Sequence, residues 1–315
     1  MPTLNGFADF NPDVDIPSLK DKVIFITGGT AGLGAASVEA LARHDPAHIY
    51  FSGRNAKAGE ALVDKVGNTK ALAALTFIEM DLSSLSSVKA AARKFAHNRL
   101  DILICNAGIL NVPPSLSKDG YEIFFATNHL GHAMLIQQLL PIMINTSEIE
   151  AADVRIVCLA SPAWRMHPKG GVDFPKLTTV SDGVVGSFYR LGQSKLANIV
   201  YAAELARRYP NILSVSVHPG VTETGMITNL PPWRKTLVHG SLWMQGQSIM
   251  KQEQGILSQL WAAAGAKRSE IVNGAFYMPV GVLTTDKLDK TAKSEKLGTD
   301  LWEWTEQALG GVKGN

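Results

Sequence analysis

The hydrophobic pattern of residues 23–140 alternates between two kinds of segment. Short runs rich in β-branched and aromatic residues are each followed by a longer Ala-rich stretch whose apolar positions have helical spacing. The four pairs are 23–29 with 35–44, 48–53 with 58–67, 75–81 with 86–96, and 100–108 with a helix from Phe124 to Leu140. Strands that alternate with amphipathic helices predict a parallel sheet covered by helices on both faces.

The alternation continues toward the end of the chain. Strand-like runs recur at 154–161, 212–220 and 274–281, and a helix pattern runs on from Ser194 through 201–209. No internal repeat, low-complexity tract or linker divides the chain. We therefore expect an α/β fold made of one doubly wound, Rossmann-type domain over residues 20–309, with an N-terminal extension at 1–19 and a tail at 310–315.

Two long segments interrupt this rhythm, residues 162–187 and 225–254. Both contain Gly and Pro, and between them they carry Trp164, Trp233 and Trp243. Long irregular segments within a compact domain are usually functional loops or disordered. We expect lids over a bulky, partly apolar substrate; the alternative is that the tryptophans pack the domain edge or an oligomer contact.

The composition favours a globular protein that acts on small molecules. Hydrophobic residues make up 46% of the 315 residues, enough for a sizeable core, while charged residues make up 18% and the net charge is +2. Lys and Arg are scattered, which argues against nucleic-acid binding. Cys105 and Cys158 lie in apolar runs without the spacing of a metal site or disulfide framework, so we expect two buried, reduced thiols.

The N-terminal segment does not resemble a targeting signal. It is acidic and interrupted by prolines, with no basic start followed by an apolar core. No apolar run approaches the roughly 20 residues that a membrane-spanning helix needs. We expect a cytoplasmic protein without an integral membrane segment.

The sequence TGGTAGLG, Thr27–Gly34, follows the first expected strand and opens the first helix. Glycine allows a tight turn and a close approach of the backbone to a pyrophosphate, which the amides at the positive end of the helix then bind. In this strand–loop–helix context the motif predicts a dinucleotide site.

With Gly28, Gly32 and Gly34 in its key places, the TGxxxGxG spacing resembles the short-chain dehydrogenase/reductase family. Further motifs follow in the family's order: Asp81 and Leu82 after the third strand, CNAG at 105–108, NHLGH at 128–132, Ser161 after the fifth strand, and HPGVTET at 218–224. NGAFYMPVG at 273–281 and LWEWTEQAL at 301–309 are similar to the retinol-dehydrogenase-like branch. The resemblance covers nearly all of residues 20–309.

The resemblance implies a set of site residues. It assigns catalytic roles to Ser161, Lys195 and Asn128. The cofactor contacts that it implies are Gly28, Gly32, Leu33, Gly34, Asp81, Leu82, Asn106, Lys195, Thr222 and Thr224. Relatives of this kind often form dimers or tetramers through helices like those at 124–140 and 196–209, although burial within one chain explains these apolar helices nearly as well.

Arg54 bears on the choice of dinucleotide. It follows the second strand, where an NAD-selective enzyme usually has an acidic residue for the ribose 2′-hydroxyl. A guanidinium suits a 2′-phosphate instead, so we expect NADP(H). Lys57 either assists or is simply solvated, and the alternative for Arg54 is an ordinary surface arginine.

The expected proton donor is missing. In the family, a tyrosine in Tyr-x-x-x-Lys protonates the product oxygen, and the lysine lowers its pKa. QSKLAN aligns Lys195 with that lysine, and four residues earlier stands Leu191. Tyr189 is six residues before Lys195 and about 120° around a helix from it, so it could serve only if the helix began late or its first turn were distorted. Among the histidines, His129 and His132 fit packing or hydrogen bonding better, whereas His167 lies in a loop and is the one to test.

Two classes of function remain open. The first is an NADPH-dependent reductase of a bulky small molecule, for instance a secondary metabolite, whose C=N or C=C bond needs no phenol. Within this class a ketone is also open if Ser161, His167 or a Lys195-bound water is the donor. The second is a non-redox enzyme such as a cyclase or isomerase, or a dinucleotide-binding regulatory protein. A further hypothesis is that Leu191 was introduced in the laboratory to disable a tyrosine.

Overall fold

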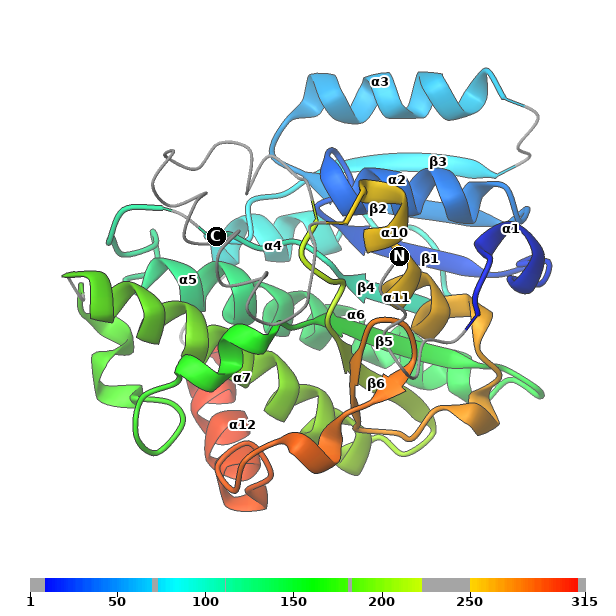
Figure 1. The fold of residues 1–315 in the computed structure, drawn as a ribbon. Helices are drawn as coiled ribbons and strands as arrows, with labels where there is room; N and C mark the ends of the chain where they lie inside the picture. The colour runs from blue at the N-terminus through cyan, green and yellow to red at the C-terminus, as the bar shows by residue number, and fades with distance from the viewer. Residues whose placement is uncertain (1–8, 70–72, 111, 181–182, 223–249, 311–315) are drawn as a thin grey trace.

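A computed structural model describes residues 9–69, 73–110, 112–180, 183–222 and 250–310 of the chain. Its centre is one sheet in the order β3-β2-β1-β4-β5-β6-β7-β8, parallel from β3 to β7 (Figure 1). Only β8 is antiparallel to its neighbour. The strands are β1 Val23–Thr27, β2 His48–Gly53, β3 Ala74–Glu79, β4 Ile102–Cys105, β5 Val154–Leu159, β6 Ile212–Val217, β7 Phe276–Met278 and β8 Val282–Leu283.

Helices cover both faces of this sheet. The α-helices are α1 Pro12–Asp15, α2 Gly32–Ala42, α3 Ala56–Gly67, α4 Leu85–Ala92, α5 Ile123–Phe125, α6 Gly131–Ser147, α7 Gly183–Arg208, α10 Gln252–Gly255, α11 Leu257–Leu260 and α12 Glu295–Gly310. Two π-helical turns are η1 Ala126–Leu130 and η4 Trp261–Gly265. Short 3-10 turns are η2 Pro162–Met166, η3 Phe174–Thr178, η5 Arg268–Glu270 and η6 Thr285–Lys287.

Two apolar cores lie on opposite sides of the sheet. One joins the strands to α4, α6, α7 and α12, and the other joins them to α2, α3, α11 and the π-helical turn η4. Burial on both faces explains why most strands read as nearly continuous apolar runs. The strand order reverses between β1 and β4, and ligands of doubly wound sheets bind outside the carboxyl ends of the strands at such a point.

The predicted α/β fold is confirmed, with three differences in detail. α7 begins at Gly183, well before the position Ser194 that the apolar pattern indicated. The last strand region divides into β7 and the short antiparallel β8. Trp164 is 3% exposed in the core beside α7, as in the alternative that this tryptophan packs the domain.

The two expected lid segments differ in how much of each the structure describes. Trp233 and Trp243 lie outside the described residues, as does Thr224. Within residues 162–178 lie the turns η2 and η3. η2 packs closely against α7, because a Cβ on Gly192 of α7 would collide with the backbone of Met166 in η2.

α12 covers the helices that the sequence suggested for oligomer contacts. The rings of Trp302 and Tyr201 stack with centroids 5.2 Å apart, joining α12 to α7. On the α6 side, Thr305 hydrogen-bonds His129 at 3.1 Å, and the amide of Gln137 donates to Glu306 at 3.2 Å. The chain itself therefore buries these faces of α6 and α7.

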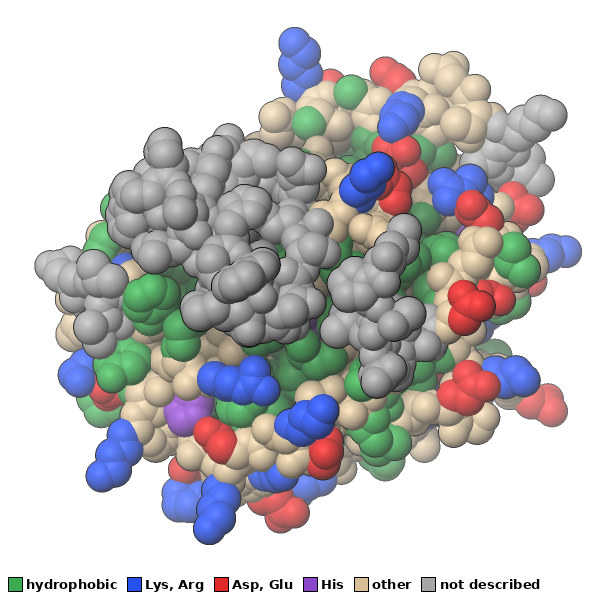
Figure 2. Space-filling view, viewed as in Figure 1, with side chains coloured by type: hydrophobic (Ala, Val, Ile, Leu, Met, Phe, Trp, Pro, Cys, Tyr) green, Lys and Arg blue, Asp and Glu red, His purple; other side chains and the backbone are tan. Residues whose placement is uncertain are grey.

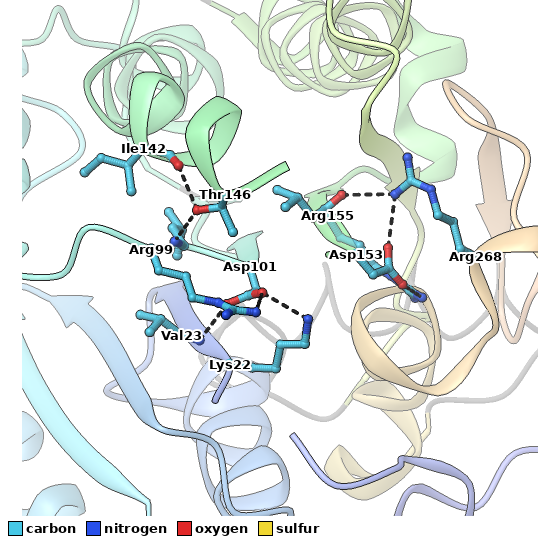
Figure 3. A network of polar contacts seen from close by, with 11 residues as sticks. Lys22, Val23, Arg99, Asp101, Ile142, Thr146, Asp153, Arg155 and Arg268 are labelled. Carbon is cyan, nitrogen blue, oxygen red and sulfur yellow. Dashed lines mark hydrogen bonds and ion pairs between the residues drawn. The ribbon is translucent and has the colours of Figure 1, made fainter. Parts of the chain in front are cut away.

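A polar network connects the amino-terminal ends of β1, β4 and β5 (Figure 3). It lies at the end of the strands opposite the carboxyl ends where the switch point is found. The fully buried carboxylate of Asp101 accepts from the backbone amide of Val23, the ammonium of Lys22 and the guanidinium of Arg99, all at 2.8–3.0 Å. Beside it, Arg155 binds Asp153 and the carbonyls that follow α11. Saturating a buried carboxylate in this way offsets its desolvation.

Both cysteines are free and buried, as expected. They stand opposite each other in the register of β4 and β5, Cys105 beside Cys158, with 1% and 4% of their surfaces exposed. In the part of the chain that the structure covers, no helix combines the length and apolarity needed to cross a membrane. Basic and acidic side chains are interspersed around the face shown in Figure 2.

Candidate active site

The loop between β1 and α2 has the shape of a phosphate site. Gly28 and Gly32 adopt φ values of 68° and 53°, the left-handed region that favours glycine. A Cβ on Gly34 would collide with the carbonyl oxygen of Gly28 and the side-chain amide of Asn106. Ala31, the N-cap of α2, provides no side-chain cap, so the first amides of the helix remain available to an anion. The loop therefore fits the pyrophosphate of a dinucleotide.

A segment from the other end of the chain supports this loop. The side-chain amide of Gln252, at the start of α10, donates to the carbonyl oxygen of Gly32 at 2.7 Å. Gly255 lies so close to Thr222 and Leu33 that any Cβ would overlap them. Nothing in the sequence pattern pointed to Gln252, because this contact joins residues more than 200 positions apart.

At the switch point, side chains join the ends of β1 and β4. Asn106 donates its amide to the carbonyl oxygen of Thr27 at 2.8 Å, and the Thr27 hydroxyl accepts from the amide of Ala107 at 3.0 Å. His132 on α6 hydrogen-bonds the same hydroxyl at 2.8 Å. These bonds hold the CNAG turn against the glycine loop.

The residues expected around the adenosine differ in their surroundings. Arg54 and Lys57 are exposed beyond β2, and neither forms an ion pair with a described residue. The carboxylate of Asp81 instead accepts from the amide and hydroxyl of Ser83 at 3.0 and 2.7 Å. Leu82 is buried against α6. The unpaired guanidinium of Arg54 is free to bind an anion.

Asn128 lies in the π-helical turn η1 and connects three elements. Its side-chain oxygen Oδ1 accepts a hydrogen bond from the backbone amide of Ile109 at 2.8 Å, and its side-chain nitrogen Nδ2 donates to the Ser194 hydroxyl at 3.0 Å. The widened turn interrupts the regular helix before α6, and π-helical turns of this kind are frequent at functional sites. Asn128 thereby fixes the segment after the CNAG turn against α7.

Lys195 and Ser161 lie at the carboxyl end of β5. The ammonium of Lys195 donates to the carbonyl oxygen of Leu159 at 3.1 Å. Removal from water lowers the pKa of Lys195 to about 8, and no described carboxylate is among the groups that shift it. The Ser161 hydroxyl accepts from the amide of Ala163 at 3.2 Å, which leaves its proton available for another acceptor.

Leu191 and Tyr189 both lie within the regular part of α7. Because the helix begins at Gly183, it neither starts late nor bends between these residues and Lys195. Leu191 is one turn before Lys195, and its carbonyl oxygen accepts from the Ser194 hydroxyl at 2.9 Å. Tyr189 is 47% exposed and is not among the hydrogen-bond partners of Lys195. The alternative that Tyr189 returns to the lysine through a distorted helix is therefore wrong.

The three histidines considered as substitute acids all have other partners. Burial lowers the pKa of His129 to about 3 and that of His132 to about 4, so both are neutral near pH 7. The ring nitrogens of His167 are engaged by the carbonyl oxygen of Pro168 at 2.7 Å and the carboxylate of Asp289 at 2.9 Å. Both ring nitrogens of His167 are therefore occupied by groups of the chain itself.

His218 is a histidine that the sequence did not single out. It is 4% exposed at the end of β6, and its pKa is lowered to about 3, first by burial and then by the ammonium of Lys195. The HPG motif suggested only a cofactor-contacting segment, so the position of this ring beside Lys195 comes from the fold.

Arg190, the residue before Leu191 on α7, forms a buried ion pair with Glu122. Arg190 is 2% exposed, its guanidinium lies 3.3 Å from Glu122, and it stacks over the ring of Phe124 at 4.9 Å. The carboxylate of Glu122 also accepts from the amides of the first turn of α5. The pair joins the helix that carries Lys195 to the helix that leads into Asn128.

The described residues do not meet the requirements of a metal centre. In the described ranges, no three His, Cys, Asp or Glu side chains are grouped to hold a metal ion. The fold provides a glycine loop and an exposed arginine beyond β2. The side chains of Asn128 and Lys195 both lie beside Gly108, and Ser161 follows β5, the strand whose last carbonyl binds Lys195.

Comparisons with known proteins agree with this arrangement. Residues 22–173 match the family model described as short chain dehydrogenase. An uncharacterized oxidoreductase, C736.13, of Schizosaccharomyces pombe is 36% identical over 272 residues, which cover 84% of this chain and 79% of that protein. Human retinol dehydrogenase 11 is 29% identical, covering 93% of this chain and 87% of its own.

Solved structures show the same fold. An uncharacterized protein from Mycobacterium paratuberculosis superimposes with a TM-score of 0.70 at 26% identity, covering 95% of this chain and 97% of its own. The RhlG/NADP active-site complex of Pseudomonas aeruginosa gives a TM-score of 0.62 at 23% identity over 84% of this chain and 96% of its own.

Proposed function

This chain belongs to the short-chain dehydrogenase family of oxidoreductases, and on that basis we propose that it is an NADPH-dependent reductase whose proton does not come from a phenol. The observation that carries the proposal is Leu191, one helical turn before Lys195 in an undistorted α7. Around it remain a cation and a hydroxyl that can stabilise negative charge on a reduced substrate.

The residues of this chain fit the cofactor at both of its ends. The amides after Gly32 would hold the pyrophosphate, Arg54 would bind the 2′-phosphate, and Lys195 would contact the nicotinamide ribose. The bound dinucleotide would supply a hydride. Ser161 would donate its free proton as a hydrogen bond to the substrate oxygen or nitrogen, and Asn128 would keep the neighbouring backbone in place.

The missing phenol defines which substrates suit the site. An iminium ion accepts a hydride without needing a proton, and a conjugated alkene can take its proton later from water. A ketone needs a donor, because its alkoxide product is a strong base. We therefore propose a bulky, partly apolar molecule with a C=N or C=C bond, or a ketone protonated through Lys195.

The main alternative is an enzyme that keeps the fold and the dinucleotide but performs no redox step, such as a cyclase or isomerase. The retained polar group of Ser161 and Lys195 is compatible with that alternative, since both side chains could polarise a substrate without hydride transfer.

Cofactor turnover separates these functions. The protein would be mixed with NADPH and a panel of cyclic imines, enones and ketones, and the absorbance of the reduced nicotinamide would be followed. Oxidation of NADPH by any of these compounds supports the reductase. Tight NADPH binding without oxidation by any of them would favour the non-redox alternative.

Restoring the phenol provides the sharper test. We expect Leu191→Tyr to raise ketone reduction at least ~10-fold, a conservative threshold below the ~10²–10⁴-fold that general acid catalysis usually contributes. Leu191→Phe is the matched control, because it adds the ring without the hydroxyl and should give no gain. If Leu191→Tyr binds NADPH normally but reduces ketones no faster, the pocket is not arranged for a phenol at residue 191.

A further inference from the structure

Residues 250–259, here named the bridging segment, contact two parts of the expected cofactor site. They contain α10 and most of α11, and α10 lies beside α2 (Figure 1). The first part of the site is the glycine loop before α2, which fits a pyrophosphate. The second part is the segment after β6, whose Thr222 is expected to contact the cofactor. The two parts are far apart in the sequence, and the bridging segment joins them.

The start of the bridging segment runs alongside the segment after β6. The backbone amide of Met250 donates to the carbonyl oxygen of Val221 at 2.8 Å, and Met250 forms an isolated parallel bridge with Thr222. Thr222 is 5% exposed, and a Cβ on Gly255 would overlap its side chain. A backbone hydrogen bond and close packing therefore hold the bridging segment to this part of the site.

The same segment contacts the glycine loop and α2. The side-chain amide of Gln252 donates to the carbonyl oxygen of Gly32 at 2.7 Å. A Cβ on Gly255 would also overlap the side chain of Leu33. Farther along, the side-chain amide of Gln259, which is 0% exposed, donates to a hydroxyl of α2 at 2.6 Å. The start of α2 and the segment after β6 are thus connected through one short stretch of chain.

The hydrogen bond from Gln252 acts on an amide of the phosphate site. The carbonyl of Gly32 and the N–H of Leu33 belong to one trans peptide unit, and because this unit is planar, the two groups point in opposite directions. Holding the carbonyl therefore fixes the direction of the N–H, and a hydrogen bond at the oxygen also polarises it. Leu33 lies in the first turn of α2, whose amides are available to an anion.

We propose that Gln252 is a positioning residue for the cofactor pyrophosphate, and that the bridging segment slows the release of the bound dinucleotide. This role rests on the cofactor site of the proposed reductase. Gln252 directs and polarises the Leu33 amide, while the contacts of Met250 and Gly255 keep the segment after β6 in a fixed position relative to the glycine loop. A dinucleotide that spans both parts leaves more slowly when neither part can move independently.

Substitutions at residue 252 can separate the hydrogen bond from the size of the side chain. Methionine has nearly the length of glutamine and no charge, but it has no donor. Lysine is also long and unbranched, and its ammonium can donate to the Gly32 carbonyl. The proposal therefore predicts opposite behaviour for Gln252→Met and Gln252→Lys.

The rate of cofactor release tests this role without any turnover. NADPH would be bound to the full chain and displaced by excess NADP⁺, and the loss of its fluorescence would be followed by stopped flow. We expect Gln252→Met to release NADPH ~3- to 10-fold faster, as for the loss of one hydrogen bond of ~0.5–1.5 kcal/mol. Gln252→Lys should release it at the wild-type rate or more slowly.

Adenosine 2′-monophosphate distinguishes positioning from general damage. This ligand has no 5′-phosphate, so it does not reach the first turn of α2, and its affinity should be the same in wild type, Gln252→Met and Gln252→Lys. An equal loss of affinity for this ligand and for NADPH in Gln252→Met would mean that the substitution disturbs the whole site, and the positioning role would be wrong.

Gln254→Ala is the matched control on the same short helix. The Gln254 side chain accepts from the backbone amide of Lys251 at 3.1 Å, within α10 itself. This variant should release NADPH at the wild-type rate. If Gln254→Ala and Gln252→Met accelerated release equally, loosening of α10 would explain both results, and the bond to Gly32 would have no separate role.

The outcomes also separate this role from the proposed function. If the wild type binds NADPH and Gln252→Met releases it at the wild-type rate, the positioning role is wrong and the reductase function stands. If the wild type binds neither NADPH nor NADH, both are wrong.

Discussion

Arg54 is the residue whose side chain we expect to select between the two nicotinamide dinucleotides. It is exposed and unpaired beyond β2, so its guanidinium can form charge-assisted hydrogen bonds to a 2′-phosphate. Such bonds contribute about 1.5–3 kcal/mol, so Arg54→Asp should weaken NADPH binding ~10- to 100-fold and leave NADH binding unchanged or improved. Fluorescence titration of both cofactors measures this.

The control for Arg54 is Lys57→Ala, three residues further along the chain, which should weaken NADPH binding less. An equal loss of affinity for NADPH and NADH in the Arg54 variant would show that the guanidinium does not recognise the 2′-phosphate.

Lys195 predicts a pH dependence of cofactor binding. Its folded-state pKa is lowered to about 8, so the ammonium is charged below pH 8 and neutral above it. The 2′-phosphate, with a second pKa of about 6, is almost entirely doubly charged near pH 8 and above, so its titration does not account for a change there. We therefore expect the affinity for NADPH to fall as the pH rises through about 8, as measured by titration from pH 6.5 to 9.5.

Lys195→Met distinguishes this group from its neighbours, because Cys158 faces the same space. The variant should bind NADPH more weakly at pH 7 and show a flat profile near pH 8. A wild-type decline that persists unchanged in Lys195→Met would assign the titration to another group.

Among single elements, α7 was the hardest to predict. Its second half has a clear apolar stripe, but residues 183–190 combine glycine, β-branched and aromatic residues without a capping signal, so only tertiary packing shows that the helix begins at Gly183. That early start matters for chemistry, since it turns Tyr189 away from Lys195. The π-helical turn at Asn128 likewise has no propensity signal and is visible only in the structure.

Between β1 and β4, the buried carboxylate of Asp101 should make a large contribution to stability. It accepts four hydrogen bonds from three residues, and removing one partner of a buried ion pair usually costs about 3–5 kcal/mol. We expect Asp101→Ala to lower the free energy of unfolding in urea by this amount.

The matched control is Asp13→Ala, since Asp13 forms an exposed ion pair with Arg43. Exposed pairs contribute at most about 1 kcal/mol, so its effect should be small. Similar losses in both variants would mean that Asp101 does not anchor the two strands.

At the scale of the whole molecule, α12 limits the surface that is available for contacts between two copies of the chain. Because Trp302, Thr305 and Glu306 cover α6 and α7, we expect no dimer through that face and a monomeric mass in light scattering. A chain that ends at Ser294 should expose the apolar faces and associate. Removing only residues 311–315 is the control and should change nothing; a truncated chain that stays folded and monomeric would contradict the role of α12 as a cover.

The helix and sheet layers and the glycine loop could be predicted from the sequence. The contacts between segments far apart in the chain, which support the candidate site, could not. Strands buried on both faces and helices with one apolar stripe produce periodic patterns, and the glycine spacing reflects a local backbone requirement. The contact of Gln252 with Gly32, the cover formed by α12 and the position of His218 depend on which distant segments meet in the fold.

The two buried thiols can be used to measure how often the folded protein opens. Cys105 and Cys158 are buried in the core between the central sheet and the layer of α6 and α7, so an alkylating reagent can reach them only when this core opens. The rate at which the native protein becomes labelled therefore measures how often this core opens, without any engineered probe. Bound cofactor, which would hold the ends of β1 and β4 together, should slow that labelling.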